Sequence, residues 1–281
     1  MHGVEREDLV RGLFEERAAE PVASGRGVDV VGRIGRGRLH GAERERVLLR
    51  ATHRHTDGVK PGELVIVLGG NGSGKTTLLR CIARTLNATG GEVWVNGTNL
   101  TRLSGDKLRR ARLELAMIAQ HAALVRRRSV LINVAMGSLG RHGGIRTALG
   151  DLPPREIEAA HGYLAEVGLA HLAVQRAGTL SGGQAQRVAI ARALAQQPRV
   201  VLADEPVASL DPEAAEDIMR LLRRLAGEER LAVLCVLHQV ELAYAYADRV
   251  VGIRDGRMAF DLPCAEVSRD AVKRLYMSEA A

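Results

Sequence analysis

The sequence predicts an α/β protein with a mostly parallel β-sheet, and three features of the chain favour this class. Hydrophobic residues make up 46% of the 281 residues and aromatic residues only 2%, so the core must be aliphatic. Short apolar runs of strand length alternate with helical runs, which is the order expected for parallel strands joined by right-handed crossovers. Ala- and Leu-rich helices suit such strands, so the composition favours a helix-covered sheet over a β-sandwich.

The first strand–helix pair follows the turn signal Pro61-Gly62. An apolar strand is predicted over residues 63–68, a Gly-rich loop comes next, and apolar residues then recur at helical spacing over residues 76–86. A short strand over residues 92–95 runs into Asn96-Gly97, the sequence signal of a tight hairpin. Further along the chain the expected strands are 200–203 and 231–237, and the expected helices are 155–167, 184–196 and 212–225.

Changes of composition along the chain predict its larger segments. Residues 106–178 are rich in helix formers with Arg and Glu on polar faces, so this block is predicted to be a helical insertion, with a break at Pro153-Pro154. Residues 1–45 are interpreted as a poorly defined leader, with a polar helix over 5–20 and a strand around 28–31 as candidate elements. The predicted organisation is a core of residues 46–105 and 179–262, a helical subdomain of residues 106–178, and a C-terminal helix of residues 263–281.

The formal net charge of +7 is compatible with nucleic acid, anionic lipid or phosphate ligands. The arginines are spread through the chain, apart from a short cluster at Arg126, Arg127 and Arg128, and no aromatic residues interleave with that cluster. A nucleic-acid-binding arm is the alternative for the leader, but arms rich in Arg and Gly are usually longer. We therefore expect no nucleic-acid partner.

Cysteine and hydropathy patterns bear on the compartment. Cys81, Cys235 and Cys264 show neither CxxC spacing nor a disulfide framework, so free thiols in a reducing compartment are expected, the first two buried. The N-terminal residues lack the apolar core of a secretory signal. Because no apolar stretch approaches the roughly 20 residues that span a bilayer, we expect this chain to reach a membrane only through a partner.

A Gly-rich loop between the first predicted strand and its helix carries the clearest chemical signal. Glycines let the backbone curl so that several N–H groups converge on phosphate oxygens, and the next helix directs its positive end at the same point. A chance Gly-rich turn is the alternative, but the strand before and the helix after disfavour it. The loop fits G-x-x-x-x-G-K-[ST] with Gly69, Gly70, Asn71, Gly72, Ser73, Gly74, Lys75 and Thr76.

This loop predicts ATP and Mg²⁺ as cofactors. Lys75 supplies a full positive charge to the β and γ phosphates, and the Thr76 hydroxyl is placed to ligate Mg²⁺, with Thr77 beside it. Asp204 and Glu205 directly follow the strand over residues 200–203, at the end of a parallel strand where ligands bind in open α/β sheets. Asp204 suits the Mg²⁺ shell, directly or through water. Glu205 suits a general base that takes a proton from the attacking water.

The run Leu180-Ser181-Gly182-Gly183-Gln184, continued by residues 185–194, resembles the signature motif and helix of ABC ATPases. Five such residues also fit a helix-capping turn with Ser181 as N-cap, but the helix and the acidic pair that follow favour the family. The resemblance covers about residues 60–262. It implies a RecA-like P-loop core with a mostly parallel sheet, an N-terminal antiparallel β part and an α-helical insertion subdomain.

The resemblance also implies roles for single residues elsewhere in the chain. Gln120 resembles the Q-loop glutamine, which senses the γ-phosphate and Mg²⁺ where the helical insertion joins the core. Asp211 resembles the D-loop aspartate, which reaches across a dimer. His238 resembles the switch histidine that contacts the γ-phosphate, although such a residue taken alone is more often structural. The implied catalytic residues are Lys75, Gln120, Glu205 and His238, and the implied metal ligands are Thr76, Gln120 and Asp204.

The resemblance further implies partners and a location. In this family the signature of one subunit closes over ATP held by the phosphate loop of another, so a homodimer with two composite sites is expected. ATP joins the two halves and hydrolysis lets them part, a cycle that transmembrane permease subunits read. A periplasmic or lipoprotein solute-binding protein is an indirect partner, and the location is the cytoplasmic face of the inner membrane. The residues expected to contact ATP across the dimer are Ser181, Gly182, Gly183, Gln184 and Asp211.

Several stretches resemble the ATPases of phosphonate importers more narrowly. On this resemblance the chain powers uptake of phosphonate or a related phosphorus oxyanion, and residues 126–128 belong to the surface that meets the permease. A solvated basic turn is the alternative for those residues. Import of phosphate, amino acids or another small solute is a second hypothesis, and a soluble ABC ATPase acting on ribosomes or DNA is a third. The matching stretches are residues 124–134, 137–141, 175–177, 202–212, 237–240, 246–249 and 252–257.

One part of the family pattern is missing. Family members carry an aromatic ring upstream of the phosphate loop that stacks on adenine, but residues 28–59 contain no Phe, Tyr or Trp. His40, His53 and His55 are the candidate substitutes, and the sequence does not choose between them. The apolar alternation before the loop is also weakened, because residues 52–58 are polar. The phosphate and Mg²⁺ ligands are intact, so hydrolysis is still expected.

Overall fold

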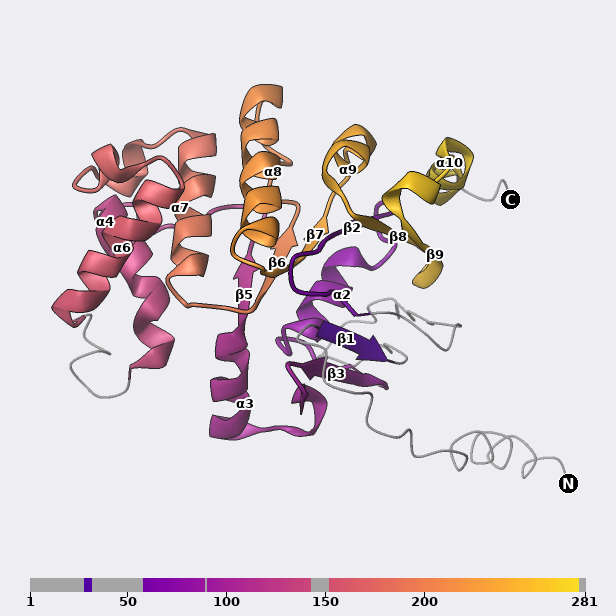
Figure 1. The fold of residues 1–281 in the computed structure, drawn as a ribbon, viewed down its shortest axis with the longest axis horizontal. Helices are drawn as coiled ribbons and strands as arrows, with labels where there is room; N and C mark the ends of the chain where they lie inside the picture. Colours follow the sequence, from indigo (N-terminus) through magenta and orange to yellow (C-terminus); the bar gives the residue numbers. More distant parts are fainter. Residues whose placement is uncertain (1–27, 32–57, 89, 143–151, 278–281) are drawn as a thin grey trace, which may run out of the picture.

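The computed structural model describes residues 28–31, 58–88, 90–142 and 152–277, and its centre is a six-stranded β-sheet (Figure 1). The strand order is β5-β6-β7-β2-β8-β9, and the neighbouring strands are parallel except for β8 and β9. The predicted mostly parallel sheet is therefore confirmed. Its strands are β2 (Leu64–Leu68), β5 (Leu115–Ile118), β6 (Val200–Asp204), β7 (Ala232–Val236), β8 (Arg249–Arg254) and β9 (Arg257–Pro263).

A separate antiparallel sheet has the order β1-β3-β4 and consists of β1 (Val28–Val31), β3 (Glu92–Val95) and β4 (Thr98–Asn99). Asn96 and Gly97 join β3 to β4 with φ values of 48° and 77°, so both central residues have the positive φ that tight hairpins favour. The pairing of β1 with β3 confirms the strand expected around residues 28–31 and the antiparallel part of the fold.

The helices cover the parallel sheet and form a block at one end of it. Figure 1 shows α7, α8 and α9 along one face, α2 and the antiparallel sheet on the other, and α4 and α6 beside α7. No helix in the described part of the chain has the length and apolar character needed to cross a bilayer. The α-helices are α2 (Lys75–Ile82), α3 (Gly105–Ala111), α4 (Val130–Ala135), α6 (Pro154–Glu166), α7 (Gly182–Leu194), α8 (Pro212–Gly227), α9 (Val240–Tyr246) and α10 (Arg269–Tyr276). Short 3₁₀ turns span Leu100–Arg102, Arg112–Glu114, Met136–Arg141, Ala170–Leu172, Ala177–Thr179 and Cys264–Glu266.

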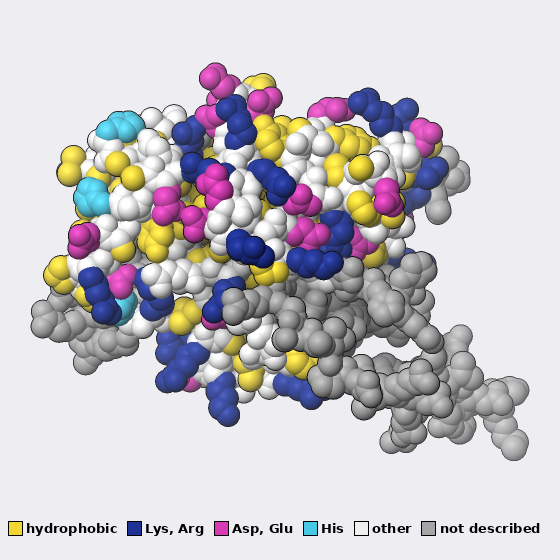
Figure 2. All heavy atoms as spheres, in the orientation of Figure 1, with side chains coloured by type: hydrophobic (Ala, Val, Ile, Leu, Met, Phe, Trp, Pro, Cys, Tyr) yellow, Lys and Arg dark blue, Asp and Glu magenta, His cyan; other side chains and the backbone are white. Residues whose placement is uncertain are grey.

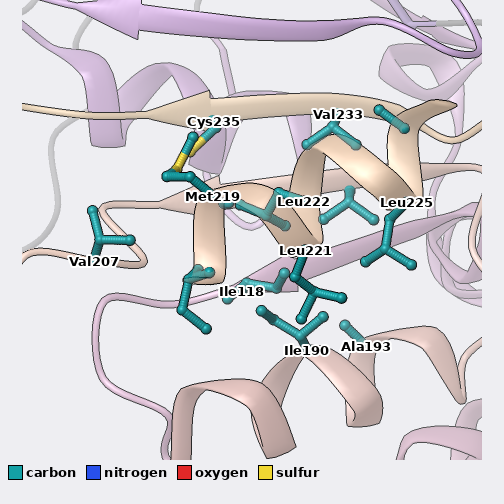
Figure 3. Close-up of a cluster of buried hydrophobic side chains, with 14 of the residues drawn as sticks. Ile118, Ile190, Ala193, Val207, Met219, Leu221, Leu222, Leu225, Val233 and Cys235 are labelled. Atoms are coloured by element: carbon teal, nitrogen blue, oxygen red, sulfur yellow. The ribbon is translucent and has the colours of Figure 1, made fainter. Parts of the chain in front are cut away.

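The central strands are buried on both faces, which explains their continuous apolar sequences. In β2, Leu64 and Ile66 pack in the cluster beneath α7, α8 and α9, whereas Val65 and Val67 pack in the cluster on the α2 side. Figure 3 shows part of the first cluster, with α8 side chains such as Met219 lying against strand residues. The two clusters are almost entirely aliphatic, as the low aromatic content requires, and Cys81 and Cys235 are buried free thiols as expected.

Strand β5 corrects the expectation that residues 106–178 form a helical block. Residues 115–118 pair in parallel with β6 and form an edge of the main sheet. Four apolar residues give too short a run to separate a strand from a helix by periodicity, and pairing with β6 decides the outcome. Three of the four side chains are buried, and Met117 is 37% exposed.

Two predicted helices also differ in extent. The helix expected over residues 76–86 ends at Ile82, because Arg84 adopts a left-handed φ of 55° and the Arg80 carbonyl accepts the N–H of Thr85 at 3.0 Å, as in a Schellman cap. The C-terminal helix expected over residues 263–281 begins only at Arg269, because β9 continues to Pro263 and a 3₁₀ turn follows. The leader helix and the three candidate histidines lie outside the described residues.

Charged side chains are mixed over the face shown in Figure 2, where Lys and Arg alternate with Asp and Glu and the largest basic group lies over α3. Two arginines of that helix are paired, because Arg109 and Arg110 both contact Asp106, at 2.9 and 3.0 Å. Such exposed pairs contribute little to stability because solvent screens the charges.

Candidate functional site

Residues 69–74 connect β2 to α2 as a tightly curled loop. Gly74 is the N-cap of α2 and has a left-handed φ of 103°, which glycine adopts without the steric cost of a Cβ. Gly69 has no room for a side chain, because a Cβ there would lie 2.2 Å from the carbonyl oxygen of Ile253 in β8. The backbone shape and the neighbouring strand therefore both require glycine at these positions.

The Lys75 side chain folds back into this loop and is only 5% exposed. Its Nζ donates hydrogen bonds to the carbonyl oxygens of Gly69 and Gly70, at 2.8 and 2.9 Å. Burial lowers the pKa of Lys75, while the Glu205 and Asp204 carboxylates act in the opposite direction. A cation is thus held against the backbone that would surround an anionic ligand.

The loop also contains a buried hydroxyl that lacks a partner. Ser73 is 6% exposed, and its Oγ makes no hydrogen bond to any residue in the described part of the chain. Its carbonyl oxygen accepts the N–H of Gly256, at 3.1 Å, so the β8–β9 turn fixes the backbone of this residue. A buried unpaired hydroxyl costs about 1–3 kcal/mol, and a phosphate oxygen in the loop would satisfy it.

The carboxylate predicted for the metal shell lies beside the hydroxyl predicted for the same shell. Thr76 Oγ1 donates to Asp204 Oδ1 at 2.9 Å, and this contact joins the first turn of α2 to the end of β6. Burial raises the pKa of Asp204, and the Thr76 hydrogen bond opposes that rise. A hydroxyl and a carboxylate are the hard oxygen donors that Mg²⁺ accepts together with nucleotide phosphates, so these two residues fit that ion.

Glu205 lies one residue beyond β6 and pairs with His238. The distance from His238 Nε2 to Glu205 Oε1 is 2.6 Å. Glu205 has a φ of 51°, a left-handed conformation that is strained for a residue with a Cβ, and its N–H donates to the Val236 carbonyl at 3.1 Å. Strained residues of this kind concentrate at functional sites because the surrounding structure must hold them in place.

Gln120 lies at the same edge of the sheet as these carboxylates. β5 pairs with β6 so that Ile118 is opposite Ala203, and Gln120 follows two residues later with an exposed side chain. Parallel strands end at one edge, so the fold brings together residues that are far apart in sequence. The structure therefore gathers the loop, Asp204, Glu205, His238 and Gln120 at the carboxyl ends of four strands.

The second glycine-rich turn, residues 181–184, lies at the start of α7 and not at the edge that carries the loop of residues 69–74. Ser181 caps α7, and Ser181 and Gln184 form a reciprocal capping box in which each side chain accepts the other residue's N–H. A Cβ on Gly183 would lie 3.1 Å from Ala214 of α8, so the turn packs against the adjoining helix. In Figure 1, α7 and α2 lie on opposite faces of the main sheet, and among the described residues no hydrogen bond joins the two glycine-rich turns.

Comparison with known proteins identifies the family that has this combination of fold and site residues. Residues 54–208 match a family model described as "ABC transporter". The chain belongs to the ABC transporter family. It is 47% identical over 221 residues to "Phosphonates import ATP-binding protein PhnC" of Wolinella succinogenes, a match that covers 79% of this chain and 80% of the relative. It is 48% identical over 219 residues to the protein of the same name from Frankia casuarinae, covering 78% of this chain and 87% of that one.

Solved structures agree with this assignment. The dimeric ATP-binding cassette MJ0796 bound to ADP and Pi has a TM-score of 0.70 and 28% identity, covering 84% of this chain and 98% of that one. CbiO1 of Clostridium perfringens, part of the cbiONQ transporter complex, has a TM-score of 0.73 and 26% identity, covering 89% and 94%. As an ABC ATPase, this chain binds ATP and hydrolyses it.

Within the ABC ATPase, Asp211 and the signature residues have local roles as well. Asp211 is the N-cap of α8, and its Oδ1 accepts the N–H of Ala214 at 2.9 Å. Because Ser181 and Asp211 are exposed, their side chains are accessible to a second molecule. Their predicted contacts across a dimer stay predictions.

Some contacts of the site carry no sequence signal. The Gly256 N–H donates to the Ser73 carbonyl. A Cβ on Gly70 would lie 3.5 Å from the Leu275 carbonyl of α10, so the C-terminal helix reaches the phosphate loop. Burial raises the pKa of Tyr276, the last residue of α10, and the nearby backbone of Gly69 acts in the opposite direction. These residues follow ordinary turn and helix patterns, and only the packing of β8 and α10 beside β2 brings them to the loop.

Replacing Lys75 with Ala is expected to weaken ATP binding by about 10- to 100-fold, because hydrogen bonds to charged groups contribute about 1.5–3 kcal/mol. Binding is measured by equilibrium titration with a fluorescent ATP analogue. Lys107→Ala removes an exposed lysine of α3 and serves as the matched control. Unchanged affinity in Lys75→Ala would contradict the phosphate-binding role of this side chain.

Proposed function

We propose that this chain is the ATP-hydrolysing subunit of an importer that takes up phosphonate, or a related phosphorus oxyanion, through a separate permease. The observation that carries the proposal is identity close to one half with two proteins named as phosphonate import ATP-binding proteins, over more than three quarters of the chain. The assembled site supports the energy-coupling part of this role. The solute itself is expected to contact the permease and a periplasmic or lipoprotein solute-binding protein.

Hydrolysis is proposed to follow from the arrangement at the strand ends. The backbone N–H groups of residues 69–77, Lys75 and the Ser73 hydroxyl bind the phosphates. Thr76 and Asp204 hold Mg²⁺, which neutralises charge on the phosphate oxygens when bound, and Gln120 contributes from the same edge. Glu205 accepts a proton from the attacking water, and its 2.6 Å contact with His238 orients the carboxylate.

The signature motif is proposed to act in a second copy of the chain. Residues 181–184 begin a helix whose free N–H groups suit an anion, yet they are separated from the phosphate loop of their own chain. A two-fold homodimer gives each phosphate loop a signature turn, with Asp211 at the contact between subunits. The dimeric form of MJ0796 with ADP and Pi supports this arrangement.

The permease is proposed to contact the basic turn of residues 126–128, which precedes α4. Binding to the permease is proposed to hold this subunit at the cytoplasmic face of the inner membrane. Residues 126–128 are exposed. The carbonyl of Arg128 accepts the N–H of Ala177, at 3.0 Å, which brings the turn beside the segment that contains Val174, an 88% exposed apolar residue. Exposed apolar side chains rimmed by charge are typical of protein contact surfaces.

Replacing Glu205 with Gln is expected to retain ATP binding and give a stable ATP-bound dimer, because the amide keeps the shape of the carboxylate but is not a base. Hydrolysis is expected to fall by about 100-fold or more, the usual contribution of general-base catalysis. Phosphate release and light scattering measure turnover and dimer formation. Glu228→Gln, at an exposed glutamate beyond α8, is the control. Wild-type turnover in Glu205→Gln would exclude Glu205 as the base.

Removal of Mg²⁺ with EDTA is expected to stop ATP hydrolysis, since the β and γ phosphate charges are then no longer neutralised. Re-addition of Mg²⁺ restores turnover. Rates are compared at fixed ATP concentration and ionic strength. Hydrolysis at an undiminished rate in EDTA would contradict the assignment of Thr76 and Asp204 as metal ligands.

Reconstitution of the full transporter in liposomes, with ATP supplied on the side of this subunit, tests the proposed solute. Uptake is expected for members of a phosphonate panel and to disappear in the Glu205→Gln variant. Phosphate and amino acids are tested in parallel as the alternative solutes. Uptake of those alone, or co-sedimentation of the chain with ribosomes in place of a permease, would contradict the proposal.

A further inference from the structure

The segment that carries Gln120 is held by side chains of the signature helix α7. Residues 119–125 follow β5 and make few backbone hydrogen bonds to the sheet. Gln186, in the second turn of α7, donates from Nε2 to the carbonyl oxygen of Ala119 at 3.1 Å. Gln186 is 3% exposed, so its side chain reaches Ala119 from within the core. The residue that directly precedes Gln120 is therefore bound to the helix that begins at the signature turn.

Arg192, further along α7, holds the other side of Gln120. Its Nη2 donates to the carbonyl oxygen of Ala122 at 2.8 Å, and its Nη1 donates to that of Ala123 at 2.9 Å. Ala123 has a left-handed φ of 44°, a conformation that alanine seldom adopts and that surrounding contacts must maintain. The guanidinium forks across two consecutive carbonyl groups and so fixes the strained turn.

The Arg192 guanidinium has an unusual environment for a structural arginine. Burial lowers the pKa of Arg192, and within the described residues no carboxylate forms an ion pair with it. The guanidinium is partly buried, and its hydrogen bonds go to the two backbone carbonyls of Ala122 and Ala123. A positively charged side chain therefore holds the backbone directly after Gln120.

Helix α7 also packs against strand β5. Figure 3 shows Ile118 of β5 beside Ile190 of α7, and both are buried in the same cluster. Gln196, just beyond α7, donates to the carbonyls of Leu113 and Leu115 at 2.9 and 2.7 Å and so holds the start of β5. Helix α7 and the residue just beyond it therefore contact both ends of β5 and the segment that follows it.

We propose that Arg192 and Gln186 are positioning residues, which place Gln120 according to the position of the signature helix. When α7 shifts as its signature turn engages nucleotide on a second subunit, the two side chains carry the shift to residues 119–123. Gln120 of one subunit thereby responds to nucleotide bound by the second subunit, at the site that the first subunit's signature turn completes. The inference rests on the proposed role of Gln120 and on the proposed homodimer, and it adds the residues that link them.

The link is tested in the full chain with a double-mutant cycle on ATP turnover, measured without any transported solute. Arg192→Met is expected to lower kcat about 10- to 100-fold, the effect of misplacing an active-site group by about 1 Å, with KM for ATP changed less than about two-fold. Because Arg192 acts through Gln120, adding Arg192→Met to Gln120→Ala is expected to cause no further loss. Losses that multiply in the double variant would overturn the proposal.

Hydrogen exchange gives a readout that does not depend on activity. In Arg192→Met, exchange is expected to rise in a peptide spanning residues 119–125 and to stay unchanged in the phosphate loop. Arg192→Lys keeps the charge but reaches only one carbonyl, so its exchange and its kcat are expected to fall between those of the wild type and Arg192→Met. Unchanged exchange over residues 119–125 in Arg192→Met would also overturn the proposal.

Gln196→Ala is the matched control, because this side chain also donates to backbone carbonyls at β5 but holds the end far from Gln120. It is expected to leave kcat within about two-fold of the wild type. A loss as large as that of Arg192→Met would indicate a general loosening of β5 and contradict a specific link. If Gln120→Ala alone leaves turnover unchanged, the proposed role of Gln120 fails, whereas the exchange result still decides whether Arg192 holds the segment.

Discussion

The site depends on the parallel register of four strands. Ile118 of β5 lies opposite Ala203 of β6, Ala203 opposite Cys235 of β7, and Val67 of β2 opposite Val236 of β7. Because these strands end together, the phosphate loop, two carboxylates, a histidine and a glutamine emerge at one edge of the sheet. A slip of one residue in any pair would turn the following side chain to the opposite face. The apolar packing on both faces prevents such a slip, so the aliphatic core fixes the geometry of the polar site.

The site holds several groups in states that would be unfavourable elsewhere. Burial acts against the charge of Lys75 and against that of Asp204, since it lowers the first pKa and raises the second. The Ser73 hydroxyl lacks a partner in the described residues, and Glu205 has a left-handed backbone. A bound triphosphate with its metal would oppose each of the first three costs, because it brings anionic oxygens to Lys75 and Ser73 and a cation to Asp204. The structure is thus organised for a charged ligand of that kind.

The two glycine-rich turns differ in what they pack against, and this difference separates their roles. The loop after β2 is fixed from behind by β8, the β8–β9 turn and α10, which leaves its open side to phosphate. The turn at Ser181 is fixed by its own capping box and by α8. Helix α7 extends from that turn along β5 to the residues that hold Gln120. One helix therefore connects the surface proposed for a second subunit with the edge of the sheet that is proposed to carry out hydrolysis.

The sequence by itself determined the parts of this protein whose chemistry is local. Residues 69–74 form a loop because glycines permit the curl, Ser181 begins a helix because its hydroxyl caps it, and Asp204-Glu205 end a strand. The hairpin at Asn96-Gly97 belongs to the same group. Tertiary structure alone decided that residues 115–118 form a strand and not part of a helical block. A run of four apolar residues is too short for its periodicity to distinguish a strand from a helix, and the pairing with β6 decides the outcome. Tertiary structure also decided the contacts of Gln186 and Arg192, whose carbonyl partners lie 67 to 70 residues away in the chain, and that of Gly256 with Ser73. These contacts join common side chains or backbone groups across large sequence separations, so no local pattern marks them and only the packed sheet brings them together.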